Sequence, residues 1–250
     1  MILLLGGTSE SLQIADELTR RGLPFVLSVT TDYGEELSEH HARMVSRRVL
    51  TPKLFTPFLI EHHIHLIIDA THPFARVVSQ FAIEASIKNH VGYIRFERPQ
   101  LVEEGPYLKL VDNLKEACNR VKSQKGIVYL STGSKTADKY AEIIGIQRLH
   151  VRVLPTEYAL KKLANIGFST NQIDAIQGPF STKLNVELFS RANSSFVITK
   201  ESGRRGGVQE KIKACESLKI QCVVIKRPVI NYPEKVSTFD SLWEKMKVIR

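Results

Sequence analysis

The chain has 250 residues, of which 43% are hydrophobic and 24% are charged, as in globular proteins and unlike low-complexity chains. No apolar run approaches the ~20 residues that cross a bilayer, and the start, Met1–Gly7, lacks the basic residues of a secretory signal. Cys118, Cys215 and Cys222 cannot all pair, and none of them belongs to a Cys-x-x-Cys motif. We therefore expect a soluble, cytoplasmic protein.

The formal net charge of +9 indicates either an anionic partner or a generally basic, solvated surface. An anionic partner could be a nucleic acid, a phosphate-bearing cofactor or a polycarboxylate. The basic residues are spread along the chain and form only short clusters, such as Arg47-Arg48 and Arg204-Arg205. Charge alone does not decide between these interpretations.

Short apolar strands alternate with amphipathic helices along the chain, which is the pattern of parallel sheets flanked by helices. In the first half we expect strands at 2–5, 25–29, 45–49, 65–69 and 92–96, and helices at 9–21, 52–62 and 74–90. In the second half we expect strands at 127–130, 149–154, 173–176, 195–199 and 221–225, and helices at 113–123, 137–144, 157–165, 183–191, 208–218 and from Asp240.

The segment 97–107 between the two halves is polar and contains Pro99 and Pro106, as expected of a connection between domains. We therefore predict an α/β fold with two Rossmann-like, doubly wound parallel-sheet domains and a cleft between them. An N-terminal nucleotide-binding domain would cover residues 1–103. A C-terminal α/β domain that completes the substrate cleft would cover residues 104–250.

Ligands of such sheets bind outside the carboxyl ends of the strands, so the residues after each strand are candidates for a functional site. In this chain most of these residues are small, hydroxylated or charged. The candidate loops are Gly6–Glu10, Ser28–Asp32, Asp69–Pro73, Ser131–Lys135, Gln177–Ser181 and Thr199–Gly203.

The segment Gly6–Ser9 lies between the first strand and the first helix, where backbone amides can approach a pyrophosphate. It departs from the Gly-x-Gly-x-x-Gly pattern, because Ser11 and Leu12 occupy the region of the third glycine. The segment therefore fits either a phosphate-binding loop or a glycine turn with a Ser or Thr helix cap.

The loop after the second strand carries Ser28, Thr30 and Thr31 where an NAD-specific fold usually has an acid that binds the ribose hydroxyls. Asp32 and Glu35 come slightly later, and the absence of an acid at the expected position favours NADPH over NADH. After the strand at 65–69, the Asp69–His72 pair suggests acid–base chemistry, a metal site or a wall of the cofactor pocket, and we favour the last.

Lys200–Gly203 precedes Gly206-Gly207 and could be a flexible connection. A cation, a hydroxyl and several backbone amides can also form an anion cradle, which is the interpretation that we favour.

Taken together, these loops resemble those of the precorrin-6A reductase family, including its cobalt-precorrin-6A counterpart, from the pathway to the corrin ring of vitamin B12. The resemblance spans almost the whole chain. The matching segments are Leu4–Glu10, Ser28–Gly34, Asp69–Ala75, Arg95–Pro99, Thr132–Lys135, Arg152–Pro155, Gln177–Ser181 and Thr199–Gly203. One departure is the basic pair Arg204-Arg205, where a less basic pair is expected.

The resemblance implies an NAD(P)H-dependent oxidoreductase that reduces one carbon–carbon double bond of the precorrin-6A or cobalt-precorrin-6A macrocycle to give precorrin-6B. The nicotinamide would deliver a hydride, and a proton would be added at the neighbouring carbon, with no metal required. The substrate carries many acetate and propionate groups, which explains the positive charge, because Arg and Lys bind carboxylates through charge-assisted hydrogen bonds. Arg95, Arg98, Lys135, Arg152 and Lys200 are the candidates.

The resemblance and the loop positions together give two sets of expected site residues, while the catalytic residue is left unassigned. The expected cofactor-binding residues are Gly6, Gly7, Thr8, Ser9, Glu10, Ser28, Thr30, Thr31, Asp69, Ala70, Thr71, His72 and Pro73. The expected substrate-binding residues are Arg95, Arg98, Thr132, Gly133, Ser134, Lys135, Gly178, Pro179, Phe180, Ser181, Lys200, Glu201, Ser202 and Gly203. We expect NADPH as the cofactor, with NADH as the alternative.

Two other hypotheses stay open. The chain could be a different NADPH-dependent reductase on the same scaffold, or a non-catalytic module that senses nucleotides or binds nucleic acid. The sequence offers no groove-reading motif and no aromatic stacking platform, so we expect no nucleic-acid partner. Because the apolar runs are too short to cross a bilayer, we also expect no membrane partner. The oligomeric state, a monomer included, is left open.

Overall fold

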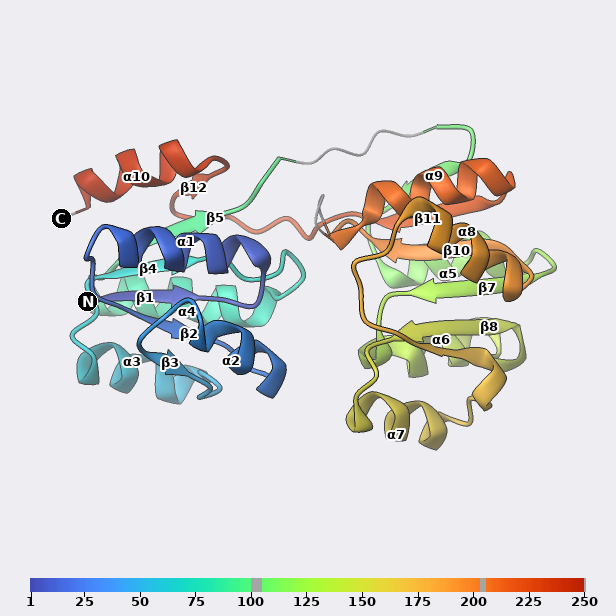
Figure 1. Cartoon of the computed structure of the whole chain (residues 1–250), viewed down its shortest axis with the longest axis horizontal. Coiled ribbons are helices and arrows are strands. Elements are labelled where there is room, and N and C mark those ends of the chain that lie inside the picture. Colours follow the sequence, from blue (N-terminus) through green and yellow to red (C-terminus); the bar gives the residue numbers. More distant parts are fainter. Residues whose placement is uncertain (100–104, 203–205, 250) are drawn as a thin grey trace. The chain divides into compact units, whose positions relative to one another are not determined.

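The computed structural model describes residues 1–99, 105–202 and 206–249, which form two compact α/β units. Unit 1 contains Met1–Pro99 and Pro228–Arg250, and unit 2 contains Gln100–Arg227. Each unit has a six-stranded sheet in which all neighbouring strands are parallel (Figure 1). The prediction of two parallel-sheet α/β domains is confirmed, and the cleft expected between them stays a prediction.

The first sheet has the strand order β12-β5-β4-β1-β2-β3. Its strands are β1 (Ile2–Leu5), β2 (Phe25–Ser28), β3 (Val45–Ser46), β4 (Leu66–Asp69), β5 (Gly92–Phe96) and β12 (Lys235–Val236). Its helices are α1 (Ser9–Arg20), α2 (Asp32–Glu39), α3 (Pro52–Glu61), α4 (Arg76–Asn89) and α10 (Phe239–Val248).

The second sheet has the strand order β6-β11-β10-β7-β8-β9. Its strands are β6 (Leu108–Val111), β7 (Ile127–Ser131), β8 (Leu149–Val153), β9 (Ile173–Ala175), β10 (Ser194–Lys200) and β11 (Gln221–Ile225). Its helices are α5 (Leu114–Lys122), α6 (Ala137–Ile144), α7 (Glu157–Ile166), α8 (Thr182–Arg191) and α9 (Val208–Leu218), with short 3₁₀ turns η1 (Ser134–Thr136), η2 (Ile146–Arg148) and η3 (Thr170–Gln172).

Strand β1 is buried on both faces, which explains why it reads as an unbroken apolar run. Leu4 belongs to the same core cluster as Ile14 of α1 and Leu242 of α10. Leu3, which points to the opposite face of the sheet, belongs to the same cluster as Phe55 of α3. Figure 1 shows α1 and α10 along one side of this sheet and α3 along the other.

Both sheets are built by the same sequence of connections. In the first sheet the chain runs outward from β1 to β2 and β3 and then returns to the other side of β1 with β4 and β5. In the second sheet it runs from β7 to β8 and β9 and returns beside β7 with β10 and β11. The direction of winding therefore reverses between β1 and β4 and between β7 and β10, and ligands of open α/β sheets bind at the carboxyl ends of such strands.

The expected second domain, 104–250, has to be corrected, because the structure places 228–250 in unit 1. The backbone N–H of Arg95 donates to Glu234 O (2.9 Å), and that of Glu97 donates to Val236 O (2.9 Å), so β12 extends the first sheet beyond β5. The expected boundary between residues 103 and 104 lies outside the described residues.

Helix α2 and the strands β6 and β12 were not predicted from the sequence. Helix α2 contains Gly34, which weakens the helical pattern. Strand β12 has only two residues, Lys235 and Val236, so it shows no periodicity. Among the described residues, no helix is both long enough and apolar enough to span a membrane.

The replacement Leu242→Ala tests whether the C-terminal helix stabilises unit 1. Leu242 is fully buried against the first sheet, and a Leu→Ala change at such a site costs about 2–5 kcal/mol. We expect hydrogen exchange to accelerate in peptides from 1–99, with little change in peptides from 106–227. The control Val248→Ala removes a side chain that is 81% exposed and should change the exchange of neither set of peptides. Faster exchange confined to unit 2 would contradict the assignment.

Candidate active site

In unit 1 the loops after β1 and β4 meet where the winding of the sheet reverses. Thr8 caps α1, because its Oγ1 accepts a hydrogen bond from the N–H of Ser11 (3.1 Å). The same Oγ1 donates to the carbonyl oxygen of Ala70 (2.7 Å), a residue 62 positions later in the chain. The structure thus brings Gly6–Ser9 and Asp69–Pro73, two of the expected cofactor-binding segments, to one edge.

The geometry at Gly7 fits a bound phosphate. Gly7 has φ +103°, a conformation that other residues rarely adopt, and a Cβ at this position would meet no atom within 4 Å. The backbone therefore faces open space directly before the N-terminus of α1, where peptide dipoles favour an anion. Glu10, in the first turn of α1, accepts a hydrogen bond from Ser9 Oγ (3.1 Å).

The loop after β2 contributes hydroxyl groups. The carbonyl oxygen of Ser28 accepts a hydrogen bond from the N–H of Gly6 (2.8 Å), while Thr30 is exposed. Thr31 caps α2 by accepting a hydrogen bond from the N–H of Gly34 (3.0 Å). Arg47, at the same edge, was noted from the sequence only as part of a basic pair.

Arg47 directly follows β3, the neighbour of β2, so it lies at the same edge of the sheet as this loop. It forms ion pairs with Asp32 and, at 3.5 Å, with Glu35. Its position after an edge strand is the signal that could have identified it.

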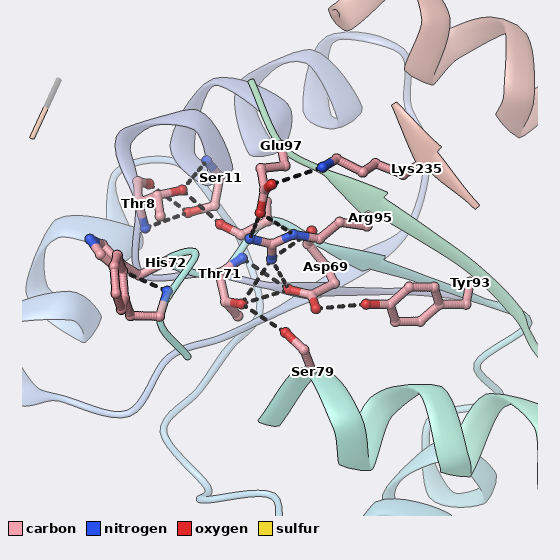
Figure 2. Close-up of polar contacts among 12 residues, drawn as sticks. Thr8, Ser11, Asp69, Thr71, His72, Ser79, Tyr93, Arg95, Glu97 and Lys235 are labelled. Atoms are coloured by element: carbon pink, nitrogen blue, oxygen red, sulfur yellow. Dashed lines mark hydrogen bonds and ion pairs between the residues drawn. The ribbon is translucent and has the colours of Figure 1, made fainter. Parts of the chain in front are cut away.

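A buried cluster of charged residues lies behind the loop after β4 (Figure 2). Arg95 is only 1% exposed and Asp69 is fully buried, and Arg95 Nη1 donates to Asp69 Oδ1 (2.8 Å). On its other side, Arg95 Nη2 donates to Glu97 Oε2 (2.9 Å). Burial by itself would raise the pKa of the Asp69 carboxyl, but the charge of Arg95 and the hydroxyls of Ser79 and Thr71 hold that pKa below its ordinary value.

Two residues expected to bind substrate carboxylates are engaged inside unit 1. The guanidinium of Arg95 is enclosed by protein carboxylates, so this geometry does not support direct contact with a substrate. Arg98 is partly exposed and forms an ion pair with Glu10 (3.4 Å), which joins two expected site residues.

His72 Nδ1 accepts a hydrogen bond from the N–H of Phe74 (3.3 Å), so its ring is held in the turn that contains Pro73.

In unit 2 the loops after β7 and β10 also meet where the winding of the sheet reverses. Lys200 Nζ donates to the carbonyl oxygen of Thr132 (3.3 Å). Gly133 has φ +80° and faces open space, as Gly7 does in unit 1. Ser134 is buried at the start of η1, and Lys135 is exposed.

Arg152, at the end of β8, is a buried cation whose described partners are neutral. Its Nη1 donates to Asn185 Oδ1 (2.8 Å) and its Nη2 to Ser131 Oγ (2.7 Å). Its guanidinium lies 4.1 Å from the ring centre of Phe180. Burial lowers the pKa of Arg152 below its ordinary value. Asn185 was not expected from the sequence, and it is fully buried.

The loop that contains Gly178 and Pro179 is exposed and is joined to this cation. Asn185 Nδ2 donates to the carbonyl oxygen of Ser181 (2.8 Å), and Ser181 Oγ caps α8 through the N–H of Leu184 (3.1 Å). The expected segment from Gly178 to Ser181 is therefore held beside Arg152.

The loop after β10 is fixed by a second buried cation, Lys211 of α9. Lys211 Nζ donates to the carbonyl oxygen of Gly206 (2.7 Å), which also accepts from Ser202 Oγ (3.2 Å). Burial and the nearby charge of Arg152 lower the pKa of Lys211 to about 8.

Glu201, also in this loop, is buried, and its carbonyl oxygen accepts a hydrogen bond from Arg227 Nε (3.3 Å). Gly203, an expected substrate-binding residue, and the basic pair Arg204-Arg205 lie outside the described residues.

A family model described as "Precorrin-6x reductase CbiJ/CobK" matches residues 1–247. The chain belongs to this family. The cobalt-precorrin-6A reductase of Methanococcus maripaludis is 38% identical over 94% of this chain and 94% of that protein. The cobalt-precorrin-6A reductase of Priestia megaterium is 34% identical over 97% of this chain and 96% of that protein. A solved structure of CobK precorrin-6A reductase has a TM-score of 0.81 and 21% identity, and the match covers 99% of this chain and 96% of that chain.

Membership of the CbiJ/CobK family confirms the resemblance stated from the loops and, with it, the prediction of a reductase that belongs to cobalamin biosynthesis. The match to the solved structure supports the two-sheet fold. Among the described residues, no group of three or more His, Cys, Asp or Glu side chains is placed to hold a metal ion.

The replacement Asp69→Asn tests the buried ion pair. It leaves Arg95 buried without its closest counter-charge, and breaking a buried pair in this way costs about 3–5 kcal/mol of unfolding free energy. The control Asp16→Asn affects a carboxylate that is 56% exposed and should cost far less.

The cost of Asp69→Asn should also depend on pH. Folding lowers the pKa of Asp69. Its contribution to the free energy of unfolding is therefore present above the pKa of the unfolded state, near 3.8, and is lost as the pH falls through the pKa of the folded state. Denaturant titrations should therefore show the two proteins converging in acid. An equal difference at all pH values would contradict the ion-pair assignment.

Proposed function

We propose that this chain reduces a carbon–carbon double bond of cobalt-precorrin-6A with NADPH, to give the corresponding dihydro product, the cobalt form of precorrin-6B. The names of the two relatives support the cobalt-containing substrate, because both are cobalt-precorrin-6A reductases that match this chain almost from end to end. When bound, the reduced nicotinamide supplies the hydride.

The nucleotide is proposed to bind at unit 1, as the cofactor-binding residues expected from the sequence imply. Gly7 offers an open backbone at the N-terminus of α1, and the hydrogen bond from Thr8 to Ala70 holds the loop after β4 next to it. Backbone amides at a helix N-terminus bind phosphate without a cationic side chain. This arrangement suits a pyrophosphate.

Arg47 supports NADPH over NADH. A fold that binds NAD usually has an acid at the end of the second strand, whereas an Arg near this position accommodates the 2′-phosphate of NADP. Here the strand β2 ends in Ser28, and the neighbouring strand is followed by Arg47, which is half exposed. NADH stays the alternative.

The observation that carries the substrate assignment is the set of buried cations at the carboxyl edge of the second sheet. Arg152 forms no ion pair with a carboxylate in the part of the chain that the structure describes, and a buried charge without a counter-charge is costly. Burial and the charge of Lys135 lower the pKa of Lys200, and Lys211 is affected in the same direction. Carboxylates of a tetrapyrrole would relieve this positive potential.

In this proposal the protein acts mainly by orienting its two ligands. Placing reactants in a productive geometry can supply about 7 kcal/mol or more of a barrier. The helix caps at Thr8, Thr31 and Ser181, and the hydrogen bond from Thr8 to the loop after β4, fix the backbone from which both ligands would be held. The proposed cytoplasmic location is consistent with Cys118, Cys215 and Cys222 being free thiols.

The deciding experiment mixes the purified protein with cobalt-precorrin-6A and with either NADPH or NADH in the absence of oxygen. We expect the absorbance bands of the macrocycle and of the reduced nicotinamide to change together, with equal molar amounts of the two consumed. The reaction should be faster with NADPH than with NADH. A parallel reaction with metal-free precorrin-6A should be slower. Oxidation of NADPH by another acceptor with no change in either macrocycle would favour a different reductase, and nucleotide binding without turnover would favour a sensing module.

The buried lysine of α9 predicts a pH dependence of substrate affinity. Lys211 is cationic below its pKa of about 8 and neutral above it, so the affinity for a polyanion should fall as the pH rises through that value. The profile of kcat/KM against pH should show this step in the wild type and lose it in Lys211→Met. Lys213→Met, on the exposed side of the same helix, should keep the step. An unchanged profile in Lys211→Met would exclude this role.

A further inference from the structure

In the charged cluster behind the loop after β4, the positive and negative charges are equal in number and pair with one another. It contains two cations, Arg95 and Lys235, and two carboxylates, Asp69 and Glu97 (Figure 2). Arg95 is 1% exposed, and its three nitrogens all donate to protein oxygens. A guanidinium that is this deeply buried and already bonded to protein oxygens is not open to a ligand, so any part that it plays in the reaction must pass through the residues that it holds.

Toward the loop, Arg95 fixes both the side chains and the backbone. Its Nη1 donates to Asp69 Oδ1 (2.8 Å) and to Thr71 Oγ1 (3.0 Å). Asp69 Oδ1 also accepts from the N–H of Thr71 (3.0 Å), and Asp69 Oδ2 accepts from the hydroxyl of Tyr93 (2.8 Å). The turn at 69–71 is thereby held at both ends.

Ala70, the residue inside this turn, extends the effect to the loop after β1. Its carbonyl oxygen accepts the hydrogen bond from Thr8 Oγ1 (2.7 Å), and its N–H donates to Leu5 O (3.0 Å). Thr8 is the cap of α1 and directly follows Gly7. The position of the proposed phosphate-binding loop therefore depends on a turn that Arg95 holds in place.

The far side of Arg95 is held by the C-terminal segment, defined here as 228–236. Glu97 Oε2 accepts from Arg95 Nη2 (2.9 Å), while Glu97 Oε1 accepts from Lys235 Nζ (3.0 Å). The ring of Tyr232 lies 5.3 Å from the guanidinium and stacks at 6.4 Å with the ring of Tyr93. This segment thus provides a second wall and a second charge that keep the guanidinium in position.

We infer that Arg95 is a positioning residue for the nucleotide, and that Lys235 of the C-terminal segment acts with it by fixing Glu97. The inference rests on the proposed function, because the loop that they position is the proposed phosphate-binding loop. It assigns the C-terminal segment a part in nucleotide affinity, although none of its residues touches that loop in the hydrogen bonds described above.

Lys235→Gln is the test variant, because Lys235 is half exposed and its replacement leaves the buried Arg95–Asp69 pair intact. We expect the dissociation constant and the KM for NADPH to rise about 3- to 10-fold, with kcat at saturating NADPH nearly unchanged. Lys235→Arg keeps the charge and should restore most of the affinity. The matched control is Lys245→Gln, which breaks the exposed pair with Glu234 (2.9 Å) of the same segment and should leave both constants unchanged.

Arg95→Lys should weaken NADPH more than Lys235→Gln does, since an ammonium cannot reach Asp69, Thr71 and Glu97 together. If this variant does not fold, the NADPH affinity of Lys235→Gln is by itself the test of the inference. Equal affinities in Lys235→Gln and the wild type, or equal losses in Lys235→Gln and Lys245→Gln, would overturn the inference. A lower melting temperature without a change in NADPH affinity would show a structural role only and would overturn it as well.

Hydrogen exchange separates this inference from the proposed function. In Lys235→Gln, amides at 6–9 and 69–72 should exchange faster than in Lys245→Gln, whether or not a nucleotide binds. If the wild-type protein binds no nicotinamide nucleotide, the proposed function fails, and the exchange rates still decide whether Lys235 fixes the two loops. Unchanged exchange at both loops would reject the inference.

Discussion

The buried ion pair between Arg95 and Asp69 holds the turn after β4 in place at the carboxyl edge of unit 1. Removing two charges from water is expensive, and further hydrogen bonds with Thr71, Tyr93 and Glu97 offset part of that cost. Such a network tolerates few intermediate arrangements. It therefore gives one defined position to the turn at 69–71 and, through Ala70, to the start of α1.

The two units place different chemistry at equivalent points of the same winding pattern. Each has a hydrogen bond across the reversal of the sheet, from the Thr8 hydroxyl to Ala70 in unit 1 and from the Lys200 ammonium to Thr132 in unit 2. Unit 1 neutralises its buried cation with its own carboxylates, whereas the buried Arg152 of unit 2 has amide and hydroxyl partners. Under the proposed function, the first edge holds phosphate through backbone amides and the second holds carboxylates through cations.

The sequence was sufficient to predict the strands and loops that short local patterns of residues specify. Strands such as β1 and β4 are buried on both faces and therefore read as continuous apolar runs, and the loops after them follow directly. The placement of 228–250 could not be predicted in this way, because it depends on the pairing of Lys235 with Arg95, 140 positions apart by their numbers. A two-residue strand has no period of its own.

The burial of Arg95 between carboxylates could not be predicted from the sequence for a related reason. An arginine at the end of a strand can face solvent or the core, and the choice depends on whether carboxylates surround it. Asp69 and Glu97 are both near strand ends in the sequence, but only the folded sheet places them on opposite sides of one guanidinium. Arg152 and Lys200, by contrast, stay at the edge where the strand-end rule places them.

The return of the chain to unit 1 affects the order in which the two units can be completed while the protein is being translated. Unit 2 is continuous in the sequence, whereas unit 1 needs residues from both ends. A ribosome therefore delivers every residue of the second unit before it delivers the last strand of the first. Until Lys235 and Val236 emerge, β5 has an open hydrogen-bonding edge and Glu97 has no lysine, so the half that is translated first is the half that is completed last.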